Sequence, residues 1–234
     1  MTNSKTSEDF KNHVLSLGAD RCGIAPVERF AGAPEGFHPA DIFPECRSVV
    51  IFLKQMPPAI MLAINPVPYS HAASLLYNQL DLIGLEISIF LHRNEYHAIP
   101  IPADRPYLAW NAEKKHGQAI LSMRHAGHLA GLGFLGRNTL LIHPELGNMV
   151  YIGAVLTDME MEADPVLTGL ACPPNCNICL EVCPVKALDG TTVNQKLCRH
   201  YSGYKNERGF DIYGCNACRR KCPLRTGIKT NKAT

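Results

Sequence analysis

The stretch Cys172-Pro-Pro-Asn-Cys-Asn-Ile-Cys-Leu-Glu-Val-Cys-Pro184 decides how the last part of this chain folds. A second stretch, Cys215-Asn-Ala-Cys-Arg-Arg-Lys-Cys-Pro223, repeats its C-x2-C-x3-C-P core. Such short spacings let one tight loop place several thiolates on adjacent corners of a metal–sulfur cluster, and this pattern is typical of chains that hold two 4Fe–4S clusters. The sequence therefore predicts a two-cluster iron–sulfur segment near its C-terminal end.

The ligands of the two clusters follow from the pattern of bacterial two-cluster ferredoxins, which both halves resemble. In that pattern the cysteine before the proline binds the other cluster. We therefore assign Cys172, Cys176, Cys179 and Cys222 to cluster one. Cluster two takes Cys183, Cys215, Cys218 and, as its fourth ligand, Cys198, which stands alone between the two stretches. The gap between Cys172 and Cys176 is one residue longer than the usual C-x2-C spacing, so Cys172 is the ligand that fits the pattern least well.

Disulfides and zinc sites are weaker interpretations of the ten cysteines than iron–sulfur clusters. Disulfide frameworks are typical of secreted domains, and Met1–Phe10 is polar, without the apolar region of a signal peptide, so we expect a cytoplasmic protein. Two four-cysteine zinc sites would also use eight cysteines, but zinc ribbons pair C-x2-C knuckles and lack the C-x2-C-x3-C-P form. Cys22 and Cys46 lie far from the rest in sequence, and we interpret both as buried structural residues.

Composition restricts the class of protein only broadly. Hydrophobic residues make up 46% and charged residues 19% of the 234 residues, which is ordinary for a soluble globular protein. No apolar run is long enough to span a bilayer, so we expect no membrane partner. The net charge of +2 does not point to a nucleic-acid partner. We expect a solvated basic tail or a docking patch for an acidic electron donor at Arg219, Arg220, Lys221, Arg225, Lys229 and Lys232.

Periodic patterns in front of the cysteines predict an α+β domain over residues 1–165, followed by a second domain over residues 166–234. The run Ser48–Leu53 indicates a strand buried on both faces. Helical periodicity covers residues 8–17, 72–91 and 122–129, and further strands are expected at 22–26 and 96–101. Residues 57–68 contain four prolines and should be irregular. Residues 139–143 and 149–156 are expected to pair as strands across a turn at 144–147.

Two further stretches carry a family resemblance. Arg124-His-Ala-Gly-His-Leu-Ala-Gly-Leu-Gly-Phe-Leu-Gly-Arg-Asn-Thr-Leu-Leu-Ile142 and Gly147-Asn-Met-Val-Tyr-Ile-Gly-Ala-Val-Leu-Thr-Asp158 are similar to segments of epoxyqueuosine reductases and reductive dehalogenases. The cysteine layout, with the lone Cys198, resembles the same family. The resemblance covers about residues 10–225. The chain ends at Thr234 without the C-terminal helical repeats of epoxyqueuosine reductase, so we expect a short form.

The resemblance implies an α+β N-terminal domain of the nitroreductase-like or cobalamin-processing type, against a ferredoxin-like domain with two 4Fe–4S clusters. Electrons from a donor such as ferredoxin or flavodoxin would pass through the clusters to a corrinoid (cobalamin) or a substrate in the N-terminal domain, as in anaerobic metabolism. The activity would be that of an epoxyqueuosine reductase-like oxidoreductase. The alternatives are a non-catalytic electron-transfer protein and a reductive activator of a corrinoid-protein partner.

The resemblance also suggests individual site residues. Tyr69 and His71 lie where the family has a similar pair near its substrate cavity, and His116 is a further candidate for proton transfer. The family's aspartate proton donor corresponds to Gly117, and the nearest upstream aspartate is Asp104. The candidates for cofactor binding are Gly131, Gly133, Gly136, Arg137, Asn138 and Thr139. A dinucleotide loop is the weaker interpretation of these glycines, because they follow a predicted helix rather than a strand.

Overall fold

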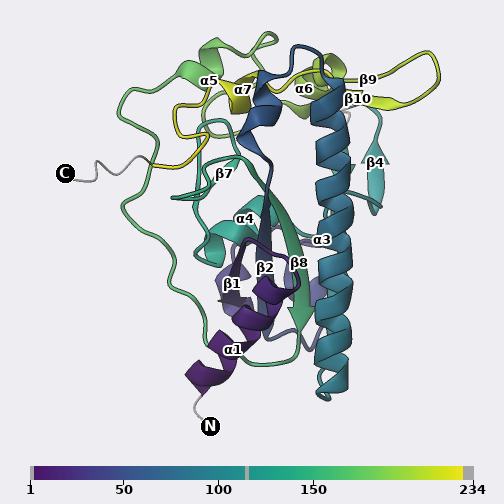
Figure 1. Cartoon of the computed structure of the whole chain (residues 1–234). Coiled ribbons are helices and arrows are strands. Elements are labelled where there is room, and N and C mark those ends of the chain that lie inside the picture. Colours follow the sequence, from purple (N-terminus) through teal and green to yellow (C-terminus); the bar gives the residue numbers. More distant parts are fainter. Residues whose placement is uncertain (1–2, 114–115, 229–234) are drawn as a thin grey trace.

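A four-stranded antiparallel sheet organises the N-terminal part of the protein (Figure 1). The computed structural model describes residues 3–113 and 116–228. The strand order is β1-β2-β8-β3, with the bounds β1 Arg21–Pro26, β2 Ser48–Gln55, β8 Val150–Thr157 and β3 Ala98–Ile101. Ile51 of β2 lies opposite Gly23 of β1 and Ala154 of β8. The α+β class predicted for this part is therefore confirmed.

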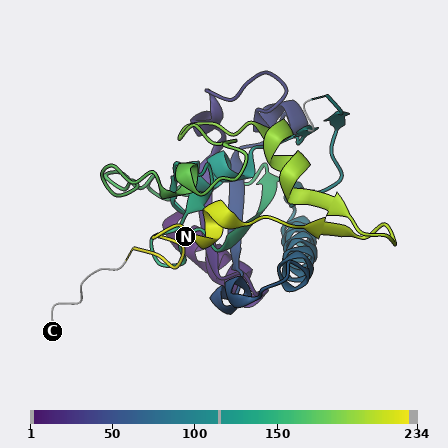
Figure 2. The same ribbon diagram turned by 90° about the horizontal axis from the view of Figure 1, so that it is seen from above.

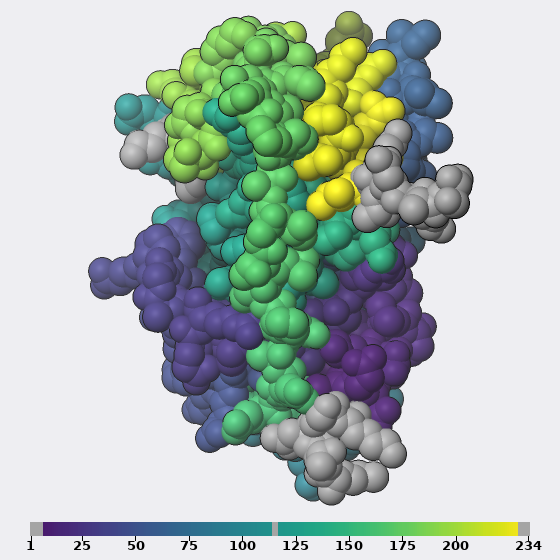
Figure 3. Space-filling model, turned by 90° about the vertical axis from the view of Figure 1, so that its left-hand side faces the viewer, coloured from purple at the N-terminus to yellow at the C-terminus, as the bar shows by residue number. Residues whose placement is uncertain are grey.

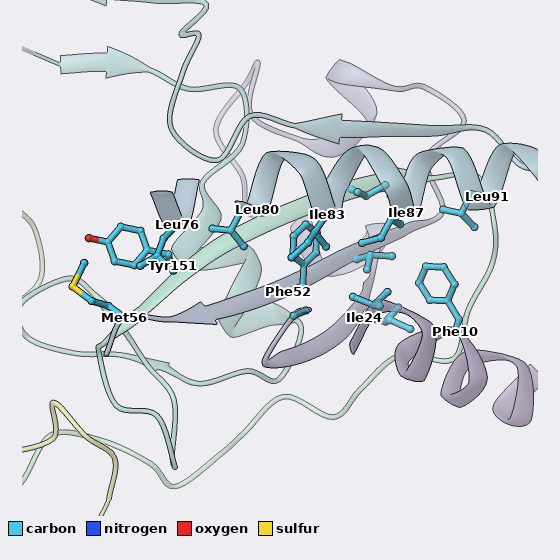
Figure 4. Close-up of a cluster of buried hydrophobic side chains, with 14 of the residues drawn as sticks. Phe10, Ile24, Phe52, Met56, Leu76, Leu80, Ile83, Ile87, Leu91 and Tyr151 are labelled. Carbon is cyan, nitrogen blue, oxygen red and sulfur yellow. The ribbon is translucent and has the colours of Figure 1, made fainter. Parts of the chain in front are cut away.

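The central strand β2 is buried on both faces, as its sequence predicts. All residues from Ser48 to Leu53 are buried. Val50 and Phe52 face a core formed with α1 (Asn3–Ser16) and α3 (Val67–Arg93), whereas Ile51 and Leu53 face a second core that includes α4 (Met123–Leu129). Figure 4 shows the α3 side chains directed toward Phe52. Successive side chains of a strand point to opposite faces of the sheet, and helices cover both faces here, so every residue of the β2 run has to be apolar or small.

The helix α3 is longer than the sequence predicted. It has 27 residues, a length of about 40 Å. It begins at Val67 rather than near residue 72, because Pro68 fits the first helical turn, where its missing N–H is not needed. The preceding residues are not wholly irregular, since Pro58–Leu62 form the 3-10 helix η2. Among the described residues, α3 is the one helix long and apolar enough by length and composition to be a candidate membrane span, although no uninterrupted apolar run was found there, and 33% of its most apolar window is buried inside the protein. The expectation of no membrane partner therefore stays a prediction.

The predicted pairing of residues 139–143 with 149–156 is wrong. The strand β7 (Leu141–Ile142) pairs with β6 (Phe134–Leu135), while β8 takes a place inside the sheet between β2 and β3. Only one bridge, between His143 and Gly147, closes the expected turn. The strand β8 is buried along nearly its whole length, so it is more stable with a strand on each side than as half of a hairpin.

After β8, an extended segment carries the chain along the outside of the sheet toward the cysteine region. Figure 3 shows this segment, in green, running over the face of the molecule. Asp164 anchors it, because its Oδ2 accepts a hydrogen bond from the backbone N–H of Ile24 at 2.8 Å. Its Oδ1 accepts another from Lys11 Nζ, also at 2.8 Å. The domain boundary predicted at residues 165 and 166 falls within this segment and stays a prediction.

Short elements cover one end of the sheet and form the cysteine region, as the view from above in Figure 2 shows. They are α5 Ile178–Glu181, α6 Gln195–Ser202, β9 Gly203–Lys205, β10 Asp211–Tyr213 and α7 Ala217–Arg220. The backbone N–H of Tyr213 donates to Ser70 Oγ at 2.8 Å and ties β10 to α3. The remaining small elements are η1 Val27–Phe30, α2 Pro39–Ile42, β4 Ala109–Asn111 and β5 His116–Gln118.

The turn after β7 contains a buried histidine that should make stability depend on pH. His143 Nδ1 accepts hydrogen bonds from the backbone N–H groups of Glu145 and Leu146 at 3.1 and 3.2 Å. Burial and the nearby Arg21 lower the pKa of His143 from 6.5 to about 4. Because the unfolded chain then binds more protons than the folded protein between these values, stability should fall as the pH drops from about 6.5 to about 4.

We expect the free energy of unfolding to fall by about 2 kcal/mol more in the wild type than in His143→Asn between about pH 7.5 and pH 5. The asparagine oxygen can accept the same two hydrogen bonds but does not titrate. Urea unfolding of both proteins at the two pH values measures the difference. Equal losses in the two proteins would show that His143 does not contribute.

Candidate functional site

Four cysteines gather at a first site. Cys172, Cys176, Cys179 and Cys222 line one small cavity of about 10 Å³ together with Arg137. The backbone N–H of Arg137 lies 3.4 Å from Cys172 Sγ. Cys222 reaches this site from the far side of α7, so the chain folds back to bring it to the earlier stretch. We call these four residues the first cysteine site.

The other four cysteines of the region gather at a second site. Cys183, Cys198, Cys215 and Cys218 line a cavity of about 230 Å³. Cys198 comes from α6 and Cys218 from α7, and the lone Cys198 is thus brought to its expected partners. We call these residues the second cysteine site. The two groups coincide with the crossed grouping expected from the sequence, whereas their binding of clusters stays a prediction.

The surroundings of the two sites disfavour the charged form of their thiols when no metal is bound. Burial, with the neighbouring thiols, raises the pKa values of Cys218 and Cys222 to about 11. Burial likewise raises the pKa values of Cys179 and Cys198, and the neighbouring thiols of each site add to the effect. Several buried thiolates repel one another, so the charged form needs metal ions between them. All eight are free thiols, as are Cys22 and Cys46.

The spread of the thiols suits a cluster better than a single ion. Zinc requires four sulfur atoms at about 2.3 Å from one centre. Among the described residues, no three His, Cys, Asp or Glu side chains converge closely enough to hold one metal ion. The second cysteine site surrounds an open space instead, as an iron–sulfur cluster requires. The cavity at the first cysteine site is much smaller, about 10 Å³.

The tripeptide Arg137–Thr139 connects the sites. Asn138 lines both cysteine sites, and its Nδ2 donates to the backbone oxygen of Cys218 at 3.4 Å. Thr139 lines the second cysteine site and also the next cavity. Arg124 Nη1 donates to the Thr139 carbonyl oxygen at 3.0 Å, which holds the turn in place. These predicted cofactor-binding residues therefore lie at the junction of three cavities.

The glycines predicted to bind a cofactor pack against other parts of the protein itself. Gly131 has a positive φ of 72°, and a Cβ there would lie 2.4 Å from the carbonyl oxygen of Pro165. A Cβ on Gly133 would lie 2.4 Å from the carbonyl oxygen of Ile142. A Cβ on Gly136 would lie 2.5 Å from the Ile142 side chain. These contacts within the chain account for the need for glycine.

A third cavity adjoins the second cysteine site, and we call it the central cavity. It has a volume of about 430 Å³ and shares Thr139, Leu140, Gln195 and Arg199 with the second cysteine site. Its size is in the range of small-ligand pockets. Its wall combines tyrosine rings and aliphatic side chains from β8 with three arginines, Arg124, Arg199 and Arg219. The sequence did not indicate this cavity, because its wall comes from many separate segments.

The predicted catalytic residues lie outside the wall of the central cavity or outside the described part. His71 lines a neighbouring lateral cavity of about 680 Å³ between α3 and the β9–β10 hairpin. Tyr69 lies behind Tyr151, whose hydroxyl is 3.5 Å from the Tyr69 hydroxyl. The side chain of His116 lies outside the described residues. Tyr77 and Asp104 line both the lateral and the central cavity.

The structure explains the glycine at the position of the family's aspartate. Gly117 lies in the wall of the central cavity, where a Cβ would come within 2.9 Å of the Tyr107 ring. No side chain fits there while Tyr107 keeps this position. The carboxylate of Asp104 reaches the same cavity from another loop, although in sequence it is displaced from Gly117. Asp104 Oδ2 is 3.3 Å from Arg105 Nε. The sequence therefore contained the acidic residue that reaches the cavity, but not at the position where the family pattern places it.

Comparison with known proteins confirms the resemblance to epoxyqueuosine reductases. No known protein-family profile matches the chain. It is 35% identical over 124 residues to the epoxyqueuosine reductase of Staphylococcus aureus, a match that covers 48% of this chain. The match spans only 32%, about a third, of that relative's length.

Solved structures extend the likeness of the fold to nearly the whole chain. An epoxyqueuosine reductase in complex with an epoxyqueuosine-modified stem loop of tRNA-Tyr has a TM-score of 0.65 and is 19% identical, over 97% of this chain and 68% of that one. A reductive dehalogenase, whose structure suggests a B12-dependent mechanism, has a TM-score of 0.66 and is 20% identical, over 99% of this chain and 33% of that one. The fold is therefore that of epoxyqueuosine reductases and reductive dehalogenases.

Proposed function

We propose that this protein is an iron–sulfur oxidoreductase that passes electrons through two 4Fe–4S clusters to a corrinoid or substrate in the central cavity. One observation carries the proposal: the three cavities form a series with shared walls. Asn138 separates the first cysteine site from the second, and Thr139 and Leu140 separate the second from the central cavity. Clusters bound in this series would supply one-electron transfer between neighbouring sites.

The protein's own residues define what the central cavity can do. A corrinoid bound there would supply a metal centre that accepts electrons. Such a molecule is larger than the cavity, which would therefore enclose only part of it. The tyrosine rings and aliphatic side chains of the wall could pack against the face of its flat ring system, and Asp104 and Tyr77 line the same cavity. A carrier without a bound acceptor would need no cavity beside the second cysteine site, so the structure gives no support to that alternative.

The relatives support the same proposal. The names of the similar proteins describe a reductase and a B12-dependent dehalogenase. The tRNA stem loop in one neighbour shows that a protein of this fold binds nucleic acid, so the expectation of no nucleic-acid partner finds no support there. We also propose a cytoplasmic protein with a ferredoxin or flavodoxin as its electron donor, because the cysteines must remain reduced to hold clusters.

Metal analysis and a corrinoid titration test the proposal. Anaerobically purified protein should contain about eight iron and about eight sulfide per chain. On titration with cobalamin, the corrin absorption bands should change. Addition of a reductant should then make the cluster EPR signal and the corrin bands change together. The variant Cys198→Ala is the control, because it should still bind cobalamin but lose the electron transfer.

Two results would contradict the proposal. Stoichiometric zinc in place of iron would refute the clusters. Full iron content without any cobalamin binding would leave the clusters but refute the corrinoid.

A further inference from the structure

Arg219 stands out in the wall of the central cavity because its charge has no counter-ion. Its Nη1 is enclosed by the protein and has no hydrogen-bond partner. Among the described residues, the guanidinium group makes no ion pair with a carboxylate. Enclosure of Nη1 without an acceptor costs free energy, since the lost hydration of this N–H group is not replaced. A buried charge of this kind is usually paired when the protein is in its working state.

The surroundings of Arg219 are aromatic rather than acidic. Its guanidinium carbon lies 5.0 Å from the ring centre of Tyr151, a distance at which a cation is attracted to the ring face. Tyr77 packs against Tyr151 with its ring centre 5.0 Å away. Burial raises the pKa values of both tyrosines, so their hydroxyls are neutral. Cation–π attraction holds the guanidinium in place but supplies no acceptor for its N–H groups.

The cavity as a whole carries positive charge. Arg124 and Arg199 line it together with Arg219. The one carboxylate in this wall, Asp104, is already paired with Arg105. Arg199 is partly engaged elsewhere, with Nε donating to Gln195 Oε1 at 3.0 Å. The net charge of the wall therefore attracts an anion. Among the described residues, Arg124 and Arg199 each donate one side-chain hydrogen bond, whereas the Arg219 side chain donates none.

The second cysteine site does not account for Arg219. Although Arg219 directly follows Cys218, it lines the central cavity and is not among the residues around the second cysteine site. Negative charge at that site would stabilise the cation at a distance, without giving its N–H groups an acceptor on the cavity side. For the part of the guanidinium that lines the central cavity, an acceptor can come from water or from a molecule that enters this cavity.

We propose that Arg219 anchors an anionic group, a carboxylate or a phosphate, of the molecule that fills the central cavity. Arginine suits this task because its planar fork donates two parallel hydrogen bonds to such a group. The inference rests on the proposed use of the cavity as a ligand site. The anion has two chemical sources: the phosphodiester of a corrinoid, or an anionic group on a second molecule bound beside it.

Calorimetric titrations with matched ligands separate the two sources. The corrinoid pair is cobalamin and cobinamide, which has the same ring system but lacks the phosphodiester. The second pair is phenyl phosphate and phenol, which share a ring but differ in charge. We expect Arg219→Gln to weaken the binding of cobalamin or of phenyl phosphate by about tenfold or more. The binding of cobinamide and phenol should stay unchanged.

Three further proteins make the titrations decisive. Arg220→Gln is the matched control, because Arg220 is the next residue of α7 and is exposed. It should bind every ligand as the wild type does. Arg219→Lys should restore part of the affinity, since it keeps the charge but not the planar fork. Thermal unfolding of each variant shows whether a loss of binding reflects a loss of fold, and the emission of Trp110, the single tryptophan, reports binding independently.

Each outcome of the titrations either supports or overturns the role proposed for Arg219. A selective loss for cobalamin assigns the anion to the corrinoid, and a selective loss for phenyl phosphate assigns it to a second molecule. Unchanged affinities in Arg219→Gln, or a wild type that binds none of the four ligands, would overturn the inference. Phenyl phosphate binding that depends on Arg219 without any corrinoid binding would uphold the inference and refute the corrinoid proposed above.

Discussion

Replacing Cys222 by alanine should remove the same cluster as replacing Cys179. This is expected although Cys222 is only four residues from Cys218, which belongs to the other site. Each single variant should lower the iron content from about eight to about four atoms per chain, because a cluster that lacks one of four thiolates is lost. The double variant Cys179→Ala/Cys222→Ala should still contain about four iron atoms. In contrast, Cys218→Ala/Cys222→Ala should contain almost none, since it affects both sites.

The double variants distinguish the crossed grouping from one that follows the sequence. If Cys215, Cys218 and Cys222 served one cluster, Cys218→Ala/Cys222→Ala would keep about four iron atoms, and Cys179→Ala/Cys222→Ala would lose nearly all. Cys46→Ala is the control, because it removes a buried thiol outside both sites and should keep full iron. Iron and sulfide assays on anaerobic protein, with EPR of the reduced state, give the result.

Replacing Phe52 by alanine should lower the free energy of unfolding by about 3–5 kcal/mol. Phe52 is completely buried, and its ring fills the space between the sheet and α3 (Figure 4). A Cβ built on Gly153 of the neighbouring strand would lie 2.3 Å from this ring, which shows how closely the two strands pack. Deletion of the ring leaves a cavity that the rigid antiparallel sheet cannot close.

Phe210→Ala is the matched control for this change. Phe210 is 66% exposed, so the same deletion there should alter stability by less than about 0.5 kcal/mol. Denaturant unfolding followed by circular dichroism measures both variants. A loss below about 1 kcal/mol for Phe52→Ala would show that the core formed by β2 and α3 does not carry the stability of this part.

The sequence predicted the main elements of the fold where the apolar pattern was strong. The helices α1, α3 and α4 were found because burial of one face imposes a period of about 3.6 residues, and the strand β2 was found from its continuous apolar run. Their ends were less accurate, as the start of α3 at Val67 shows. The strand predicted to pair with β8 was wrong, because a short segment such as 139–143 carries no information on which strand it pairs with. Register over long separations depends on the packing of the whole sheet.

The sequence predicted the grouping of the cysteines that the structure shows, whereas their binding of clusters stays a prediction, and the sequence did not indicate the central cavity. Arg219 was expected in a solvated basic tail or a docking patch, and the structure places it in the cavity wall with its guanidinium over the Tyr151 ring. Asp104 was taken as displaced from the expected acid, yet it reaches the cavity from a loop. In both cases the residue type carried the relevant chemistry, but nothing in the sequence pattern indicated which side chains would meet.

The spacing of the cysteines within each stretch is a local property. Residues two or three positions apart in a tight loop are neighbours in any fold, so the sequence by itself brings Cys176 close to Cys179 and Cys215 close to Cys218. The crossed positions of Cys183 and Cys222 depend on how the chain folds back on itself. The sequence also determined the buried strand β2, because a continuous apolar run requires cover on both faces. Only the tertiary structure decided that Asn138 and Thr139 stand between three cavities and that Arg219 faces the last of them without a counter-ion. These contacts join segments far apart in the chain, and their free energy arises only when the sheet, α3 and the cysteine region pack together.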